Sequence, residues 1–432
     1  MTLFEDIAIE DFAEVTSSKR IFLNDYVEKG IPFWRSKEVI EQFRGAEISN
    51  ELFITEEKYY NIKNKFGVPA CGDILVTSVG TIGVPFLVKD DSPFYFKDGN
   101  LTWIKNIADS VDPKYLYLWI SSQIGQQTID NQLIGSSQKA LTISALKKIK
   151  IPIPALQTQQ KIAKILANYD DLIENNLKRI KLLEESARLT YEEWFLRFRI
   201  DGKKLDIDPE TSLPFGWEKV KVNSLLSYYI GGGWGEESIS DDFSDEAYVI
   251  RGTDIDNMPH GKLEGAPLRY HKTSNLASRK LKNKDIVFEV SGGSKTEGVA
   301  KTLLITDNLL EQFNSDVMCA SFCKLVRPKE HHLGNMLHLS FKYLRRSKAT
   351  EVFEIKSASS IINYNWEAFI KHQDLIMPSN DILLSFDKRA DALINEIYNL
   401  GHQNQLLKEA RDILLPRLMT GMIDTDDMDI AV

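Results

Sequence analysis

The chain has 432 residues, of which 43% are hydrophobic and 10% aromatic, as expected for a packed globular protein of two to four domains. No apolar run reaches the roughly 18 residues needed to cross a bilayer, and the start of the chain lacks the basic residues and apolar core of a signal peptide. The three cysteines, Cys71, Cys319 and Cys323, form neither a disulfide framework nor a zinc pattern, so we expect a cytoplasmic protein.

The formal net charge of −9 argues mildly against a nucleic-acid partner, because basic surface supplies most of the affinity for phosphates. The charge is segregated, however. Residues 424–429 carry four carboxylates, whereas lysines and arginines cluster in residues 147–150, 279–284 and 342–348. Such clusters are usually solvated surface, so the total charge does not decide the partner.

The most informative pattern is an internal duplication. Residues 149–195 read as a short strand and a long helix, and a shift of 224 residues superposes them on residues 373–419 without a gap. Pro154 then falls on Pro378, Ile173 on Ile397 and Glu185 on Glu409. This period is too long for a solenoid repeat. It indicates two copies of one unit, each a domain followed by a helix.

The segments upstream match as well. Residues 30–36 resemble residues 247–252, and residues 72–80 resemble residues 284–292. The offset drifts from 216 to 212 to 224, which places the insertions in loops, where binding residues usually lie. Any two α+β domains share apolar strand patterns, but here the matches also keep their order.

The predicted fold is therefore of the α+β class, with two similar mixed α/β domains joined by two long antiparallel helices in a pseudo-two-fold internal repeat. The predicted segments are a first domain (1–153), a central spacer helix (154–200), a linker (201–217), a second domain (218–378), a C-terminal spacer helix (379–421) and an acidic tail (422–432).

Both predicted helices carry a seam of apolar residues that recur every four and then three positions, as in a coiled coil. Each seam is roughly 48 Å long and contains one asparagine, Asn176 or Asn404. If these two face each other in an antiparallel pair, Ile162 faces Leu418 and Trp194 faces Phe386 in the same register. The predicted contact residues are Ile162, Tyr169, Asn176, Leu183, Trp194, Phe386, Leu393, Asn404 and Leu418.

The alternative is that each helix packs on the core of its own domain. Several leucines lie off the first seam (Leu172, Leu177, Leu182 and Leu189). They suggest a second contact surface, which another protein could occupy.

No catalytic motif is found. The glycines of residues 231–235 lack the GxGxxG spacing, and residues 291–296 lack the glycines of a phosphate-binding loop. The histidines and carboxylates show no metal-ligand spacing. We therefore expect a binding protein and not an enzyme, with no metal or cofactor held by this chain.

The chain resembles the specificity subunit of a Type I restriction-modification enzyme. The resemblance rests on the order of several motifs, which are the strand before Ser-Val-Gly-Thr-Ile-Gly (78–83), Leu-Thr-Ile-Ser-Ala-Leu (141–146), the helix entry 155–163, Leu-Pro-Phe-Gly-Trp-Glu (213–218) and the closing segment 414–421. The second copy departs from the pattern at residues 379–381 and 291–296.

This resemblance implies two target recognition domains, each of which reads one half of a split, asymmetric site in double-stranded DNA, with the helices setting the gap. It also implies two methyltransferase (modification) subunits docked on the helices and two restriction/translocase subunits. S-adenosylmethionine, ATP and Mg would then belong to those partners. The alternatives are a specificity subunit of a Type IIB-like methylase-nuclease, a protein scaffold that does not bind DNA, and an enzyme with an unrecognised site.

The candidate DNA contacts come from loops that carry polar and basic side chains, because such groups read bases and bind phosphates. In the first domain they are Arg35, Ser36, Lys37, Ser78, Thr81, Ser136, Ser137, Gln138 and Lys139. In the second they are Arg251, Thr253, Ser294, Lys295, Thr296, Ser359, Ser360, Asn363 and Tyr364. Each has a structural alternative: an arginine at a strand end can pair with a carboxylate, and a Ser-Gly loop can be only a tight turn.

Overall fold

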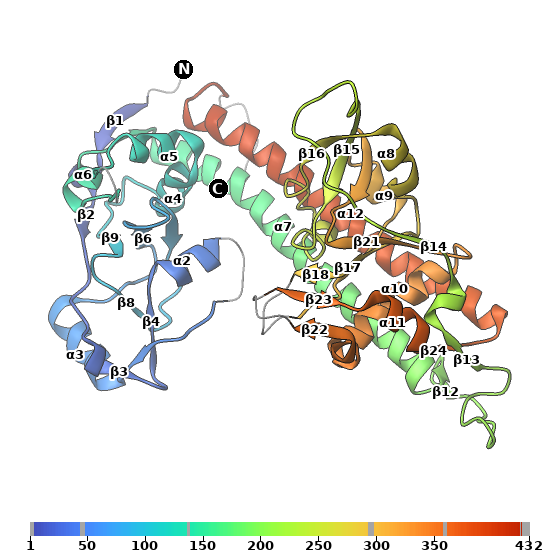
Figure 1. Cartoon of the computed structure of the whole chain (residues 1–432). Coiled ribbons are helices and arrows are strands. Elements are labelled where there is room, and N and C mark those ends of the chain that lie inside the picture. Colours follow the sequence, from blue (N-terminus) through green and yellow to red (C-terminus); the bar gives the residue numbers. More distant parts are fainter. Residues whose placement is uncertain are drawn as a thin grey trace. The chain divides into compact units, whose positions relative to one another are not determined.

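The computed structural model describes residues 4–43, 48–135, 139–292, 298–356, 361–423 and 425. The chain forms two compact units (Figure 1), Met1–Asp171 with Lys408–Val432, and Leu172–Leu407. The helices α7 (Leu156–Tyr191) and α12 (Asn380–Met419) contribute residues to both units. The segment boundaries given above separate these helices from the domains, and they stay a prediction.

The first unit contains two four-stranded sheets. One has the order β2 (Glu14–Thr16), β9 (Leu101–Lys105), β6 (Ile74–Thr77), β7 (Pro85–Leu87), and the other has the order β3 (Tyr26–Val27), β5 (Phe53–Ile54), β4 (Ile31–Trp34), β8 (Tyr95–Phe96). A separate pair joins β1 (Glu5–Ala8) to β10 (Lys150–Ile153). The helices are α1 (Ile9–Phe12), η1 (Leu23–Asp25), α2 (Ser36–Phe43), α3 (Glu56–Phe66), α4 (Pro113–Ser121), α5 (Gln123–Asp130) and α6 (Ile143–Lys147).

The central strand β6 shows why this unit folds as it does. All four of its residues are buried, as expected for an apolar strand covered on both faces. Ile74 and Val76 pack into one core cluster and Leu75 into another, because successive side chains of a strand point to opposite faces. The sheet therefore lies between two cores.

The second unit contains a four-stranded sheet in the order β14 (Leu226–Gly231), β21 (Cys323–Pro328), β17 (Ile286–Glu289), β19 (Thr302–Leu304). Two three-stranded sheets have the orders β16 (Leu268–His271), β15 (Asp245–Ile250), β20 (Asp316–Cys319) and β18 (Ser291–Gly292), β23 (Ile362–Tyr364), β22 (Glu354–Lys356). The two-stranded pairs are β11 (Arg199–Ile200) with β12 (Lys203–Lys204) and β13 (Glu218–Lys221) with β24 (Asp374–Met377).

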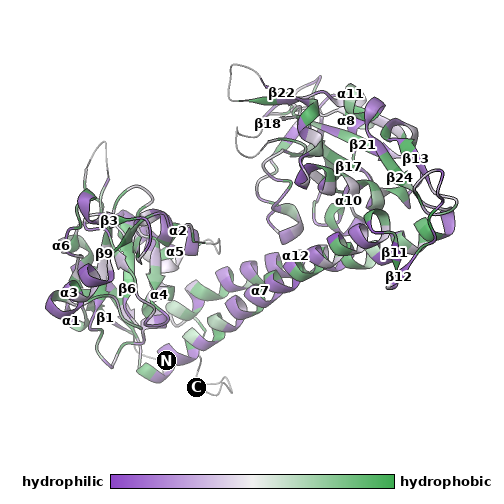
Figure 2. Cartoon of the chain, turned by 90° about the horizontal axis from the view of Figure 1, so that it is seen from below, coloured by the Kyte–Doolittle hydropathy of each residue, from purple (hydrophilic) through white to green (hydrophobic). Residues whose placement is uncertain are grey.

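The shorter helical segments of this unit are the π-helical turn η2 (Glu192–Leu196), η3 (Val222–Leu225), η4 (Met258–His260), α8 (Thr273–Arg279), α9 (Asp307–Leu310), α10 (Leu333–Arg346), η5 (Ala349–Phe353) and α11 (Trp366–His372). One large buried cluster joins the sheet to α10, to α11 and to the ends of the long helices that belong to this unit. Hydrophobic residues concentrate in these interior strands and helices (Figure 2).

The two units share one topology, so the predicted duplication of the fold is confirmed. The order β2-β9-β6-β7 recurs as β14-β21-β17-β19, antiparallel throughout. The parallel pair β4–β8 recurs as β15–β20, with Trp34 opposite Phe96 and Ile250 opposite Cys319. Two unrelated α+β domains would not be expected to have a parallel pair at the same position among antiparallel strands. The recurrence of this pair therefore supports a true repeat.

The long helices α7 and α12 pair antiparallel, side by side (Figure 2). Asn176 Nδ2 donates a hydrogen bond of 3.0 Å to Asn404 Oδ1, the contact that the predicted register requires. The rings of Trp194 and Phe386 lie 5.6 Å apart, as the same register requires.

The rest of the predicted seam is buried or half-buried, and its contacts agree with this register. Next to the asparagines, Ile180 and Leu183 pack with Ile397 and Leu400. In the first unit, Ile162 and Leu418 belong to one core cluster, and Arg411 pairs with Asp170, beside Tyr169, at 2.7 Å. Leu393 packs against the core of the second unit. The alternative interpretation therefore also holds in part, because the helix ends pack on the domain cores as well as on each other.

We expect Asn176→Leu to destabilise the helix pair. Asn404 is fully buried, and its Nδ2 already has no partner among the described residues, so this substitution leaves its whole side-chain amide unpaired. A buried polar group without a partner costs about 1–3 kcal/mol, whereas replacing both partners by apolar groups can be nearly neutral. Urea unfolding of Asn176→Leu, Asn404→Leu and the double variant measures the coupling. Leu406→Asn, on an exposed face of α12, is the control; additive effects of the two seam substitutions would contradict the pairing.

Candidate nucleic-acid interface

In the first domain, three segments named by the sequence converge beside the end of β6. The backbone N–H of Ser78 donates to the carbonyl of Asn100 (2.8 Å), and Leu141 N–H donates to the carbonyl of Ser78 (3.0 Å). The hydroxyl of Ser36, at the start of α2, donates to the same Asn100 carbonyl at 3.3 Å. These bonds form a frame that holds the turn after β6, the turn before β9 and the segment before α6.

An open hollow of about 560 Å³ lies on this frame, lined by Ser36, Lys37, Ile40, Glu41, Val79, Gly80, Thr81 and Asn100. It brings together three of the predicted contacts, Ser36, Lys37 and Thr81. Gly80 has a left-handed φ of 75°, and a Cβ added there would meet nothing within 4 Å. The hollow is therefore open to a ligand at its glycine turn.

Arg35 and Lys37 are held by carboxylates. The backbone N–H and the guanidinium of Arg35 both donate to the buried Glu38, each at 2.7 Å, and the guanidinium also reaches Glu51 at 2.8 Å. Lys37 forms an ion pair with Glu51. Lys37 and then Arg35 lower the pKa of the Glu51 carboxyl to about 2, so this acid stays ionised near neutral pH. Arg35 thus has the structural alternative, in which it ties the start of α2 to its neighbours.

Of the other predicted residues of this domain, one is buried, one is exposed, and three lie outside the described residues. Ser78 is only 5% exposed, and its hydroxyl pairs with that of the buried Thr102 at 2.6 Å. It therefore serves the frame and is not presented at the surface as the sequence suggested. Lys139 is exposed, and its neighbour Ala140 forms a β-bridge with Val79, which places this lysine beside the hollow. Ser136, Ser137 and Gln138 lie outside the described residues.

The second domain repeats the two backbone bonds of this frame. Val290 N–H donates to the carbonyl of Phe322 (2.9 Å), and Tyr364 N–H donates to the carbonyl of Val290 (2.9 Å). These bonds correspond to those of Ser78 with Asn100 and with Leu141. The single β-bridge between Val79 and Ala140 in the first domain is extended here into the strand pair β18–β23. The two domains thus present equivalent backbone platforms.

Arg251 repeats the role of Arg35. Its backbone N–H donates to Asp254 Oδ2 (2.8 Å) and its guanidinium to Asp254 Oδ1 (2.9 Å), and Asp254 is 5% exposed. In each domain an arginine at the end of a strand therefore pairs with a buried acid three residues later. This pairing stabilises the turn, and it engages the guanidinium that the sequence offered for DNA.

The other residues predicted in the second domain lie on three segments. Thr253 and Asn363 are exposed, and Ser291 Oγ contacts Asn363 Oδ1 at 2.8 Å. Tyr364 is only 7% exposed and packs on Phe288, with ring centroids 5.3 Å apart, so it belongs to the core instead of the surface that was expected. Ser294, Lys295, Thr296, Ser359 and Ser360 lie outside the described residues.

The sequence reasoning missed Asn100 and Phe322. Each directly precedes a buried strand and supplies the carbonyl at the centre of its frame. Phe322 is 59% exposed, and its carbonyl also accepts from the N–H of Ser291, whose side chain contacts the predicted residue Asn363. The only available signal was their position one residue before the repeated strand, and that signal is visible only after the strands are paired.

Comparison with known proteins agrees with this architecture. The family model of the Type I restriction modification DNA specificity domain matches residues 1–185. The Type I restriction enzyme MjaIX specificity subunit of Methanocaldococcus jannaschii is 26% identical over 368 residues, which cover 83% of this chain and 79% of that protein. The Type I restriction enzyme HindI specificity subunit of Haemophilus influenzae is 23% identical over 94% of this chain and 96% of its own.

The chain as a whole is thus similar to Type I restriction-modification specificity subunits. The crystal structure of the S subunit of a Type I restriction-modification system from M. genitalium has the same fold, with a TM-score of 0.55 at 16% identity over 96% of both chains. Such specificity subunits act within restriction-modification complexes on DNA. By this similarity the two α/β domains are target recognition domains, and their two backbone platforms are the candidate DNA-reading faces.

Two features are absent from the described residues. Over the described part of the chain, no group of three His, Cys, Asp or Glu side chains could hold a metal ion. Within the same residues, no helix is both long and apolar enough to cross a membrane.

We expect Phe322→Ala to relax the base preference of the second target recognition domain at one position. An exposed phenylalanine can contact a thymine methyl group, and a lost base contact costs about 1–3 kcal/mol of discrimination. Competition binding with duplexes that differ by one base pair measures this change. Because no charge is removed, the salt dependence should not change. Phe215→Ala is the control, since Phe215 is 65% exposed outside both platforms. Equal weakening for all sequences would contradict the assignment.

Proposed function

We propose that this chain is the DNA-reading subunit of a Type I restriction-modification complex, and that each target recognition domain reads one half of a split, asymmetric site. The observation that carries the proposal is that equivalent backbone frames hold different side chains. Asn100 of the first domain corresponds to Phe322 of the second, and Lys37 corresponds to Thr253. Equal frames suit two equivalent positions on a duplex, whereas different side chains select different bases, so no palindrome is required.

The helix pair is the proposed spacer between the half-sites. α7 has 36 residues and α12 has 40, which correspond to about 54 and 60 Å of helix. One turn of DNA is about 34–36 Å. A pair of this length suits half-sites about one turn of DNA or slightly more apart, and the buried Asn176–Asn404 bond favours a single register.

The long helices also carry the proposed docking surfaces for two methyltransferase subunits. Leu182 and Leu189 of α7 are 70% and 39% exposed, and their repeat equivalents on α12, Leu406 and Ile413, are 52% and 55% exposed. Large apolar side chains that are exposed at equivalent positions of both repeats suit two copies of one partner.

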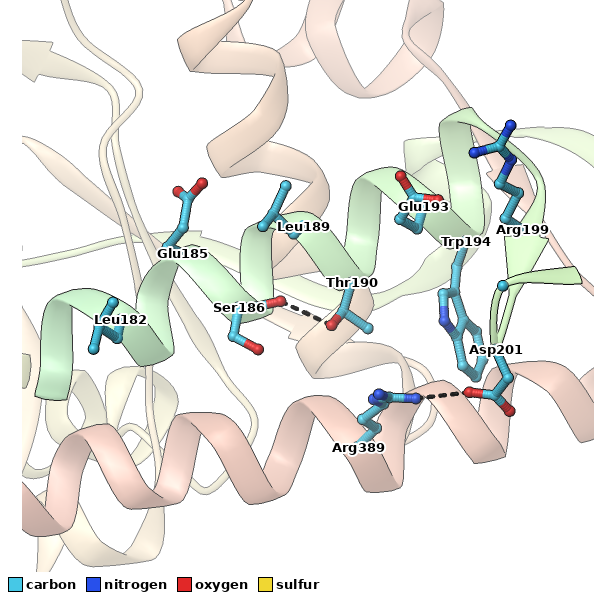
Figure 3. Close-up of a pocket in the computed structure, with 11 residues that line it drawn as sticks. Leu182, Glu185, Ser186, Leu189, Thr190, Glu193, Trp194, Arg199, Asp201 and Arg389 are labelled. Carbon is cyan, nitrogen blue, oxygen red and sulfur yellow. Dashed lines mark hydrogen bonds and ion pairs between the residues drawn. The ribbon is translucent and has the colours of Figure 1, made fainter.

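The surroundings of the first leucine pair are visible in Figure 3. Leu182 and Leu189 border a hollow of about 350 Å³ that also includes Trp194. At its edge, Arg389 of α12 donates to Asp201 at 2.9 Å. An apolar surface with a charged edge is typical of a protein–protein interface.

In this proposal the chain is not itself catalytic. The methyltransferase subunits carry S-adenosylmethionine, and two restriction/translocase subunits use ATP and Mg. A Type IIB-like methylase-nuclease would employ the same specificity subunit with different neighbours. A scaffold without DNA is the other candidate, and the net charge of −9 favours it slightly. Partner subunits that supply basic surface reconcile this charge with DNA binding.

Genome-wide mapping of methylated adenines, with the subunit present and deleted, tests the proposed function. We expect a split motif with two different halves that disappears on deletion and returns when the chain is restored. Methylation that is unaffected by deletion would reject the DNA-reading function and favour the scaffold.

Charged substitutions on the helices test the docking surfaces. We expect Leu182→Asp with Leu189→Asp to lower the number of bound methyltransferase subunits from two to one, because a carboxylate in an apolar interface is desolvated without a partner. Leu406→Asp with Ile413→Asp should do the same, and the four substitutions together should abolish assembly. Native mass spectrometry measures the stoichiometry. Leu268→Asp, 37% exposed on β16, is the control; unchanged stoichiometry in the four-substitution variant would contradict these surfaces.

A further inference from the structure

The last residue of the central strand differs between the two target recognition domains. In the first it is Thr77, whose hydroxyl donates to the carbonyl of Thr81 (2.6 Å) and accepts from the N–H of Val84 (2.9 Å). This side chain therefore closes the turn that carries Gly80 and Thr81. Its equivalent in the second domain is Glu289, a carboxylate that is only 4% exposed.

The Glu289 carboxylate lies between three backbone segments. A Cβ added to Gly252 would lie 2.5 Å from Glu289 Oε1, and one added to Gly292 would lie 3.1 Å from it. The backbone N–H of Lys301 donates to Glu289 Oε2 at 3.4 Å. The carboxylate thus touches the turn after β15, the strand β18 and the segment before β19.

The glycine at position 252 is explained by this contact. Gly252 is not among the residues with positive φ, so its backbone conformation does not require glycine. Its repeat equivalent in the first domain is Ser36, whose hydroxyl donates to the Asn100 carbonyl, which also accepts from the N–H of Ser78, the residue after the shorter Thr77. The chain therefore has serine with threonine in one domain and glycine with glutamate in the other. The two positions compensate each other in size.

The charges around Glu289 are mixed. Burial raises the pKa of its carboxyl group, Lys301 and Arg345 lower it, and Asp256 raises it. Lys301 also pairs with Asp256 at 3.1 Å. Glu289 is therefore the buried member of a polar cluster of the second domain whose basic residues lie directly before β19 and on α10.

We propose that Glu289 is a positioning residue for base reading by the second target recognition domain. Its carboxylate holds residues 251–253 against residues 291–292, so that Thr253 and Asn363 keep one mutual geometry. Ser291 transmits this constraint to Asn363 through their 2.8 Å contact. The inference rests on the proposed DNA-reading function, and it adds a residue that touches no base.

The test uses the full chain assembled with its methyltransferase subunits and a pool of duplexes of random sequence. Binding selection with the unsubstituted complex defines both half-sites. We expect Glu289→Ala to reduce discrimination about tenfold at one half-site and not at the other. Glu289→Gln, which keeps the shape of the side chain and one acceptor oxygen, should retain most of the discrimination. Glu264→Gln, an exposed acid of the same domain, is the control.

Gly252→Ala provides an independent variant, because its methyl group displaces the carboxylate without removing it. We expect the same loss at the same half-site. In the double variant Glu289→Ala with Gly252→Ala, the methyl group finds space, so the loss should not exceed that of Glu289→Ala alone. Glu289→Thr with Gly252→Ser, which copies the first domain, should recover part of the discrimination. Thermal unfolding of each variant separates this effect from general destabilisation.

The outcomes separate the inference from the function on which it rests. If the unsubstituted complex selects no sequence, the proposed function is rejected, and the positioning role is rejected with it. If it selects a split site and Glu289→Ala keeps full discrimination, only the positioning role is overturned. Equal weakening for every duplex, or additive losses in the double variant, would also overturn it, because either result indicates a role in stability alone.

Discussion

The register of the two long helices depends on one buried hydrogen bond, between Asn176 and Asn404. A coiled-coil seam of leucine and isoleucine alone tolerates shifts of one heptad, because one apolar contact replaces another. An amide at a single position of each helix removes that freedom, since any shift buries both amides without a partner. The exposed apolar positions of α7 are thereby fixed with respect to those of α12. The same bond supports both the proposed spacing and the proposed docking.

A second constraint operates within each target recognition domain. The carbonyls of Asn100 and Phe322 each accept a hydrogen bond from the N–H of the residue that follows the central strand. The carbonyl of that residue in turn accepts from the N–H of Leu141 in the first domain and of Tyr364 in the second. Because backbone groups make these bonds, the side chains can change without loss of the platform. This separation of frame from side chain explains how one fold can read two different half-sites. Glu289 and Thr77 are exceptions, because at their position the side chain itself joins the frame.

Much of the fold could be predicted, because it follows from periodicity and repetition. The heptad pattern identified both long helices and their register, and the matched strand patterns identified two equivalent domains. The candidate site was predicted less well. Ser78 and Tyr364 are polar residues in apparent loops, yet both are buried, because strand pairing turns their side chains inward. Arg35 and Arg251 are at strand ends as expected, but Glu38 and Asp254 engage their guanidinium groups. Residue type and position do not reveal which partner a side chain will find.

The sequence by itself therefore determined the duplication, the antiparallel register and the resemblance to specificity subunits, because these depend on residue order and spacing along the chain. Only the tertiary structure decided which residues share a surface. It placed Asn100 and Phe322 at the centres of the two platforms, and it put Gly252 against Glu289, which are far apart in sequence. The physical reason is that a hydrogen bond or a contact between distant segments depends on how strands pair and turns close, and neither leaves a local pattern in the chain.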